Sequence, residues 1–205
     1  CQFALGYPLQ IHEIAAETPA ELWRNADYHV EWQPLKHGIF TAGFALVEAD
    51  RPGRFDVSRA EQLGVPNGPE RGRLQRGESI VLPNGRRIHP EDVLGPSRPG
   101  VKIAYCLDTQ PCAGAEKLAA NAALLITDST FSAVDAEHAH ESGHSTAVDA
   151  AEMARKCGAR QLLLTHFSGR LRQEDLRALV AEARAVFPDS NAATDLAQLK
   201  IIPRD

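Results

Sequence analysis

The sequence predicts an α/β protein with its functional residues at the ends of strands. Strand-like and helix-like patterns alternate from residue 101 onwards, and strand-like patterns dominate before residue 50. Polar residues also follow predicted strands, as Asp108 does after 102–107 and His166 after 161–165. Ligands bind at the carboxyl ends of strands in open α/β sheets, so this edge is the expected site.

Three strand-like segments open the chain. Residues 9–14, 30–36 and 41–48 alternate or run apolar, and turn residues separate them. His37 directly follows the second segment.

Residues 52–100 differ in composition from the rest of the chain. They hold seven of the thirteen prolines and eight of the fifteen glycines, so we expect a protruding, flexible arm without a packed layer. Residues 51–102 carry ten Arg/Lys against six Asp/Glu, a charge of +4, whereas the remainder carries −9. This asymmetry favours an anionic partner bound at one place, although an ordinary solvated surface explains it equally well.

The second half predicts a layered order of helices and strands. Ser145 or Thr146 is expected to cap a helix with alanines on one face. The expected elements after residue 108 are a helix over 115–122, a strand over 124–127, the capped helix ending at Gly158, a strand over 161–165, a helix over 173–187 and a closing strand over 199–202.

Cysteine usage and hydropathy exclude several classes. Four cysteines at irregular spacings, with no Cys-x-x-Cys pair, argue against a zinc ribbon or a disulfide framework and favour a reducing cytoplasm. No apolar run reaches membrane-spanning length. Because the chain begins at Cys1 and its only methionine is Met153, we expect a piece of a longer protein.

Three strand-end residues form a candidate metal-binding set. His37, Asp108 and His166 supply imidazoles and a carboxylate, the ligands that suit zinc. Two such ions can activate water and hold the oxygens of a phosphoryl displacement. Taken singly, each histidine is more often an ordinary strand-end residue.

Ordered motifs along nearly the whole chain resemble those of the ribonuclease Z family. They are Leu35-Lys36-His37-Gly38, Arg51-Pro52-Gly53, Gly64-Val65-Pro66-Asn67-Gly68-Pro69, Leu107-Asp108-Thr109, Asp128-Ser129-Thr130-Phe131, Gly143-His144-Ser145-Thr146 and Leu164-Thr165-His166-Phe167-Ser168-Gly169-Arg170.

The resemblance implies a metallo-β-lactamase fold, an αββα sandwich, and a zinc-dependent endoribonuclease that cuts precursor tRNA at its 3′ end. It implies that His37 and His166 are terminal ligands and that Asp108 is shared by two zinc ions. It also implies His144 as general acid, since imidazoles exchange protons near neutral pH, and Arg170 as a phosphate contact. A cytoplasmic homodimer without DNA or membrane partners is further implied.

This chain departs from the family pattern in three places. The family's His-x-His-x-Asp-His segment, which carries the remaining ligands and the general base, is nowhere in the sequence. Residues 1–205 are therefore expected to be a partial, inactive domain with no general base. Leu107 replaces a usual small residue, and Asp128 stands where glutamate is frequent.

The resemblance also gives residues 52–100 a function. They correspond to an arm that binds the tRNA elbow, with five candidate arginines contacting backbone phosphates. These are Arg71, Arg73, Arg76, Arg86 and Arg87.

His138-Ala139-His140 imitates a metal-binding pair, because a His-x-His in a strand points both rings to one face. The flanking polar residues instead favour a solvated loop. Two other functions stay open for the chain as a whole. One is a related phosphodiesterase or sulfatase-like hydrolase of small substrates, and the other is a non-catalytic RNA-binding subunit.

Overall fold

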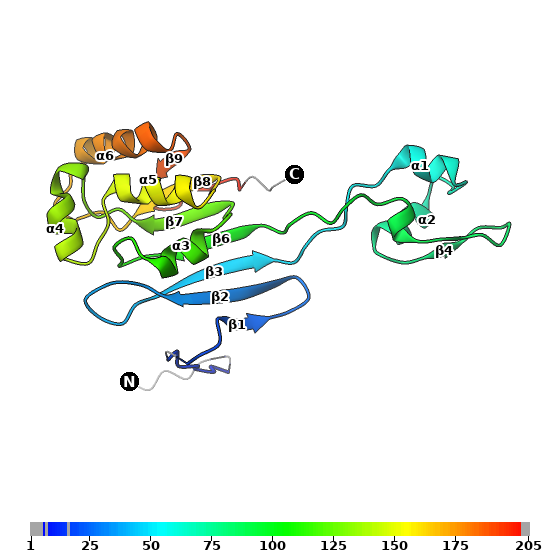
Figure 1. The fold of residues 1–205 in the computed structure, drawn as a ribbon, viewed down its shortest axis with the longest axis horizontal. Helices are drawn as coiled ribbons and strands as arrows, with labels where there is room; N and C mark the ends of the chain where they lie inside the picture. Colours follow the sequence, from blue (N-terminus) through cyan, green and yellow to red (C-terminus); the bar gives the residue numbers. More distant parts are fainter. Residues whose placement is uncertain (1–5, 7, 16, 202–205) are drawn as a thin grey trace.

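A seven-stranded sheet forms the body of the protein. The computed structural model describes residues 6, 8–15 and 17–201. The strands lie in the order β1-β2-β3-β6-β7-β8-β9 (Figure 1). Their bounds are β1 Glu21–Arg24, β2 Tyr28–Pro34, β3 Ala42–Glu48, β6 Lys102–Cys106, β7 Leu124–Asp128, β8 Gln161–Thr165 and β9 Ser190–Ala192.

The strand directions bring the predicted site residues to one edge. β1, β2, β3 and β6 pair antiparallel, and β6, β7, β8 and β9 pair parallel. Since β2 and β6 both run antiparallel to β3, the strands β2, β6, β7 and β8 all end at the same side of the sheet. Crossover connections through helices account for the parallel half.

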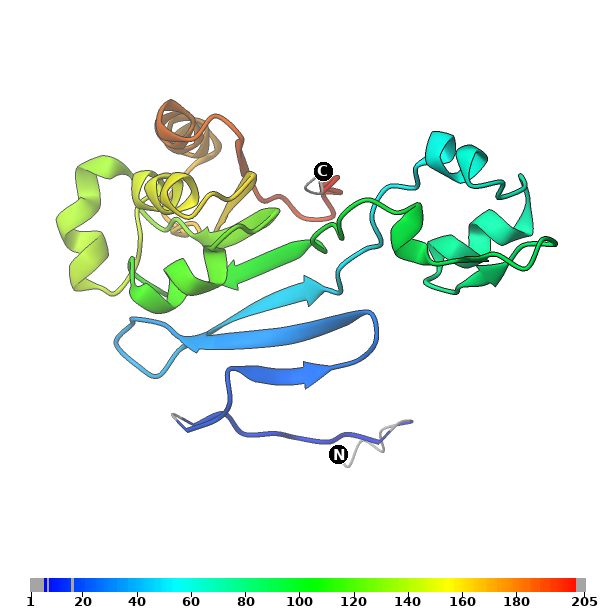
Figure 2. The same cartoon turned by 45° about the vertical axis from the view of Figure 1, so that its right-hand side comes forward.

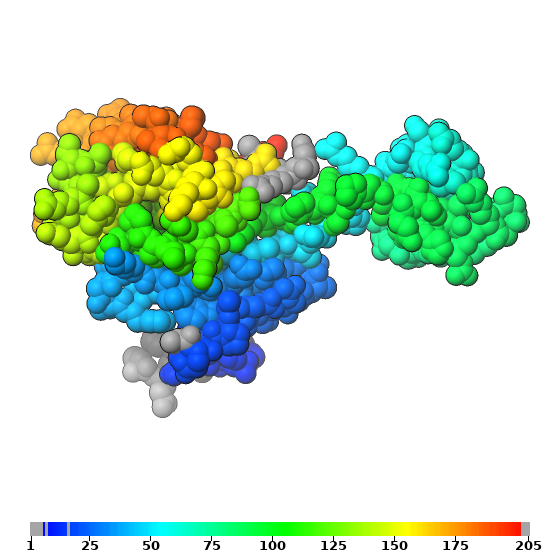
Figure 3. Space-filling view, in the orientation of Figure 1, coloured from blue at the N-terminus to red at the C-terminus, as the bar shows by residue number. Residues whose placement is uncertain are grey.

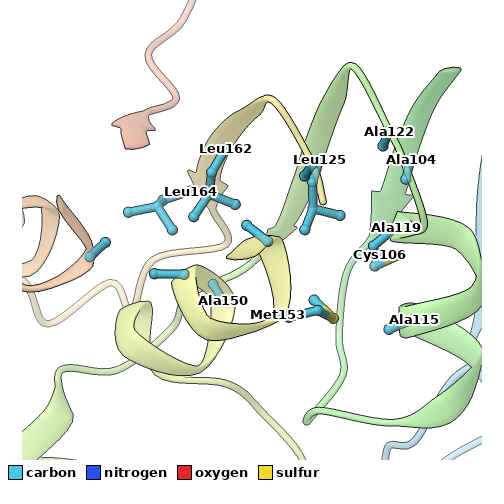
Figure 4. Close-up of a cluster of buried hydrophobic side chains, with 14 of the residues drawn as sticks. Ala104, Cys106, Ala115, Ala119, Ala122, Leu125, Ala150, Met153, Leu162 and Leu164 are labelled. Atoms are coloured by element: carbon cyan, nitrogen blue, oxygen red, sulfur yellow. The ribbon is translucent and has the colours of Figure 1, made fainter. Parts of the chain in front are cut away.

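Helices cover one face of the sheet and enclose the main core. α3 (Ala113–Ala119), α5 (Ala147–Lys156) and α6 (Gln173–Val186) pack against the strands or each other. Alanines dominate the contact, as Figure 4 shows for Ala104, Ala115 and Ala150, and their small side chains allow helices to approach the sheet closely. Burial raises the pKa of the Cys106 thiol to about 12, so this cysteine is an apolar core residue.

The opposite face of the sheet is open among the described residues. Along β6, Ala104 and Cys106 are fully buried, whereas Tyr105 between them is 46% exposed. Trp23 and Leu46 are exposed as well. One sheet with one helical layer is half of the αββα sandwich that the resemblance implies.

The inserted segment between β3 and β6 forms a projecting arm. It leaves the end of the sheet opposite to the carboxyl ends of β6, β7 and β8, through a narrow two-stranded neck (Figures 2 and 3). Its elements are α1 Val57–Gln62, α2 Pro69–Gln75, β4 Ile80–Val81, β5 Arg87–Ile88 and a 3-10 helix Pro90–Asp92.

The expectation that the arm lacks a packed core is wrong. Leu74, Ile80, Ile88 and Val93 are at most 2% exposed and pack into a second hydrophobic cluster. The prolines and glycines mark the turns of this small module: Pro69 opens α2, and Gly85, with φ 83°, lies in the β4–β5 hairpin.

Leu74→Ala is expected to destabilise the arm by about 2–5 kcal/mol, because it leaves a cavity in a core with few other large side chains. Native-state hydrogen exchange would show faster exchange in 57–93 and unchanged protection in β6, β7 and β8. Leu125→Ala in the main core is the matched control. It should speed exchange in β6, β7 and β8 and leave exchange in 57–93 unchanged. Unchanged protection of the arm would contradict a packed module.

Three sequence expectations about elements differ from the structure. Residues 9–14 form no strand, and neither do 199–201, with residue 202 outside the described part. β9 closes the sheet instead. The expected loop around 136–141 is the helix α4 (Ala136–Glu141), preceded by a 3-10 turn at Ala133–Asp135. No helix in the described part of the chain is long and apolar enough to cross a membrane.

Candidate metal centre and general acid

The backbone turns sharply at two of the predicted ligands. Asp108 and His166 follow β6 and β8 and have φ values of 49° and 60°, in the left-handed region. Non-glycine residues seldom adopt this conformation, and where they do the strain is characteristic of functional sites. The turns bring the two side chains together, with 2.8 Å between His166 Nε2 and Asp108 Oδ1.

These two residues belong to a larger group with metal-binding atoms. One ligand atom from each of Asp108, Asp128, His144 and His166 lies within 4.8 Å of the others. Asp128 ends β7, the strand between β6 and β8, so the parallel register delivers its carboxylate to the same edge. Asp108 is 49% exposed and Asp128 fully buried, so the two carboxylates have different environments.

His37 lies beside this group and outside its 4.8 Å limit. Its Nδ1 is 3.0 Å from the carbonyl oxygen of Gly143, and its ring centroid is 4.9 Å from that of His144. Because Nδ1 lies beside a carbonyl oxygen, Nε2 is the ring nitrogen that would bind a metal ion. The role of His37 as a ligand stays a prediction.

Gly143 allows this close approach. A Cβ on Gly143 would lie 2.7 Å from His37 Nδ1, and the residue has φ 83°. Both the space and the backbone conformation therefore require glycine before His144.

Asp128 holds His144 in place. His144 Nδ1 is 2.8 Å from Asp128 Oδ2, and an ionised carboxylate only accepts hydrogen bonds, so Nδ1 carries the proton. The Asp128 carboxylate also lies within hydrogen-bond distance of four other donors. These are the backbone N–H groups of Thr109, Thr130 and Ser145 and the hydroxyl of Thr130. His144 Nε2 is thus the nitrogen available for proton transfer.

Asp128 and Thr130 receive no site role from the sequence, although both lie in the motif Asp128-Ser129-Thr130-Phe131. A usable signal existed for Asp128, because it ends a strand between those that lead to Asp108 and His166.

His138 and His140 form no metal pair. They lie on α4, a helix, where residues two apart point in different directions. His140 Nε2 contacts Asp149 at 2.9 Å, at the start of α5. The His138 ring instead lies edge-on to Phe131.

The predicted phosphate-binding arginines differ in their environments. Arg71 is largely buried, 15% exposed, and contacts Glu61 and the carbonyl oxygen of Val65. Arg73 and Arg76 both contact Glu78, and the hydrogen bond from Arg73 lowers the pKa of that carboxyl. A further three arginines are exposed, two on the β4–β5 hairpin and one in the loop after His166: Arg86, Arg87 and Arg170.

Comparison with known families agrees with this architecture. A family model described as a beta-lactamase superfamily domain matches residues 7–167. The chain therefore belongs to the beta-lactamase superfamily and has the metallo-β-lactamase fold.

Within this superfamily, the chain is similar to proteins named ribonuclease Z, which confirms the resemblance predicted from the motifs. It is 42% identical over 203 residues to the one from Acaryochloris marina, covering 98% of this chain and 64% of that protein. It is 45% identical over 203 residues to the one from Salinibacter ruber, covering 98% and 62%. The chain thus spans less than two thirds of the length of these relatives.

Two solved structures share the fold. Human tRNase Z, short form, has a TM-score of 0.50 and 22% identity, covering 89% of this chain and 46% of that chain. The metallo-beta-lactamase fold protein YhfI from Bacillus subtilis has a TM-score of 0.50 and 16% identity, covering 84% and 49%. At these identities the likeness concerns the fold alone.

Proposed function

We propose that these residues belong to a metal-dependent endoribonuclease that hydrolyses the phosphodiester at the 3′ end of precursor tRNA. The products are a tRNA with a 3′-hydroxyl and a trailer with a 5′-phosphate. The observation that carries the proposal is the convergence of Asp108 and His166, with ligand atoms 2.8 Å apart, beside His144. The names of the relatives support the RNA substrate.

The donor set fits zinc. His166, Asp108 and His37 would hold zinc, and we propose two ions in the complete site. Each histidine has its Nδ1 beside another protein group, Gly143 O for His37 and Thr130 Oγ1 for His166, which is how metal-binding histidines are held. Bound divalent ions supply Lewis acidity that favours ionisation of water and offsets phosphate charge.

We assign to His144 the role of general acid, which donates a proton to the leaving group. Water attacks phosphorus, the bond between phosphorus and the tRNA 3′ oxygen breaks, and that oxygen takes a proton from Nε2 of His144. Asp128 keeps the ring oriented, because its carboxylate lies 2.8 Å from Nδ1. Arg170, exposed four residues after His166, is assigned to a substrate phosphate.

The attacking water must also transfer a proton to a general base. The sequence contains no His-x-His-x-Asp-His segment. We place the general base and the remaining ligands in the further length that the relatives have, and expect residues 1–205 alone to be inactive. The free thiols of Cys106, Cys112 and Cys157 suit a cytoplasmic protein, and the family resemblance suggests a homodimer.

The arm is assigned to the body of the tRNA, remote from the cleaved bond. It leaves the sheet at the end opposite to the site, so a substrate that touches both must be long. Arg86 and Arg87 are the preferred phosphate contacts because both are exposed, whereas Arg71 is 15% exposed and bound to the protein. Arg73 and Arg76 are intermediate candidates for phosphate binding, because each already pairs with Glu78.

The double variant Arg86→Ala/Arg87→Ala in the full-length protein is expected to weaken precursor tRNA binding by about tenfold or more. Loss of two phosphate contacts should also reduce the slope of log affinity against log salt by about one per contact. Filter binding over a salt series measures both. Arg155→Ala, which removes an exposed charge from α5, is the matched control and should change neither.

A small chromogenic phosphodiester separates this function from its rivals. The arm variant should cleave it at the rate of the unmodified protein, because the substrate cannot reach the arm. Equal losses on the diester and the precursor would argue for a hydrolase of small substrates. A full-length protein that binds no zinc would instead indicate a non-catalytic RNA-binding subunit.

A further inference from the structure

We propose that the Thr130 hydroxyl is a positioning group that links Asp128 to His166 and thereby sets the affinity of His166 for metal. One buried carboxylate would then orient both histidines, His144 directly and His166 through Thr130. The inference rests on the proposed metal site and adds a residue that touches no metal itself.

The distances require an intermediary between Asp128 and His166. Asp128 Oδ2 and His166 Nδ1 are 3.7 Å apart, beyond a hydrogen bond. Thr130 Oγ1 lies between them, 2.8 Å from Asp128 Oδ1 and 3.0 Å from His166 Nδ1. The hydroxyl can donate one hydrogen bond and accept another, so it can connect the two groups.

The direction of these hydrogen bonds follows from charge. The Thr130 hydroxyl has one proton and two acceptors nearby, Asp128 Oδ1 at 2.8 Å and the carbonyl oxygen of His166 at 2.9 Å. Hydrogen bonds to a charged acceptor are the stronger, so the proton goes to the carboxylate. A lone pair of Oγ1 then accepts from Nδ1–H of His166.

This arrangement fixes the orientation of the His166 ring. With Nδ1 held by Thr130 Oγ1, Nε2 is the nitrogen that lies 2.8 Å from Asp108 Oδ1. A ring nitrogen and a carboxylate oxygen at this distance are suited to a shared cation, which would replace the proton between them. The hydroxyl therefore orients the ring for metal binding before any ion arrives.

Thr130 itself is held on both sides. Its N–H donates to Asp128 Oδ1 at 3.0 Å, an Asx turn, and its carbonyl accepts from Ser168 N at 3.2 Å. Ser129 Oγ donates to the Thr165 carbonyl at 2.8 Å, which joins the same segment to the end of β8. Thr130 is 8% exposed, so water cannot readily substitute for its hydroxyl.

Thr130→Val in the full-length protein should lower zinc affinity by about 10–100-fold, the usual effect of losing a group that supports a ligand. Competition with a zinc-binding dye at fixed pH measures it. Thr130→Ser retains the hydroxyl and should restore most of the affinity. Thr127→Val is the matched control, because Thr127 is a buried threonine near the end of β7 whose hydroxyl donates to the Cys106 carbonyl at 3.0 Å.

A second readout is independent of metal. The imidazole ¹⁵N shift of His166 Nδ1 in the metal-free protein should change in Thr130→Val, which removes the hydrogen-bond partner of that nitrogen, and should change little in Thr130→Ser. Unchanged affinity and unchanged shifts in Thr130→Val would overturn this proposal and leave the proposed function intact, as would an equal loss in Thr127→Val. Absence of zinc binding by the unmodified protein would overturn both.

Discussion

His144→Ala is expected to lower precursor cleavage by about 10²–10⁴-fold, the range for loss of a positioned general acid. The departing 3′ oxygen of a ribose is a poor leaving group and needs a proton, which we propose that His144 Nε2 supplies. The ring is oriented by Asp128, with 2.8 Å between Asp128 Oδ2 and His144 Nδ1, and it is stacked on His166, with centroids 5.3 Å apart. Single-turnover cleavage of precursor tRNA measures the chemical step.

A substrate with a good leaving group separates acid catalysis from a general loss of structure. A nitrophenolate leaves without protonation, so the same variant should lose much less activity on a nitrophenyl diester. His138→Ala, a histidine on α4 that contacts Phe131, is the control and should cleave both substrates normally. An equal loss on both substrates in His144→Ala would count against the acid role and favour a role in site structure.

The central strands and their helices could be predicted from sequence because local patterns determine them. The strand over 161–165 was predicted with its observed bounds, and Thr146 caps α5 through a capping box with Asp149, as the cap residue indicated. Apolar residues in a buried parallel strand and a cap before an alanine-rich helix need no information from elsewhere in the chain.

The failures have equally physical causes. The arm has a core because Leu74 of α2, Ile80 of β4 and Ile88 of β5 meet, which composition alone cannot reveal. The residues around His138 form a helix although their polarity suggested a loop. Helix α4 has an apolar contact through Ala139, which is fully buried, and a tertiary contact from His140 to α5.

The site was predictable only in part. Asp108 and His166 follow strands, and that position marks them in the sequence. Thr130 has no such signal, because its importance comes from contacts with Asp128 and His166, the latter 36 residues away. Strand-end position thus marks Asp108, Asp128 and His166 as candidates in the sequence, whereas the contacts of Thr130 emerge only from tertiary structure.

Asp128 is expected to be essential for the stability of the site. Asp128→Asn should lower the free energy of unfolding of the metal-free protein by about 2–6 kcal/mol, because two donors, Thr109 N–H and His144 Nδ1–H, lose their acceptor. Asparagine has one acceptor oxygen, and its NH₂ group would face N–H or O–H donors that now point at the second carboxylate oxygen. Each donor left without a partner costs about 1–3 kcal/mol. Urea denaturation with zinc removed measures the change.

Asp108→Asn is the matched control because it makes the same chemical change at the same edge of the sheet. Asp108 is 49% exposed and has φ 49°, a conformation that asparagine tolerates, so its metal-free stability should change by about 0.5 kcal/mol or less. Its zinc affinity should nevertheless fall, since a ligand is lost. The two carboxylates would then be distinguished, with Asp128 supporting the site and Asp108 binding the metal. If Asp128→Asn is as stable as the unmodified protein, its carboxylate is not what holds these loops together.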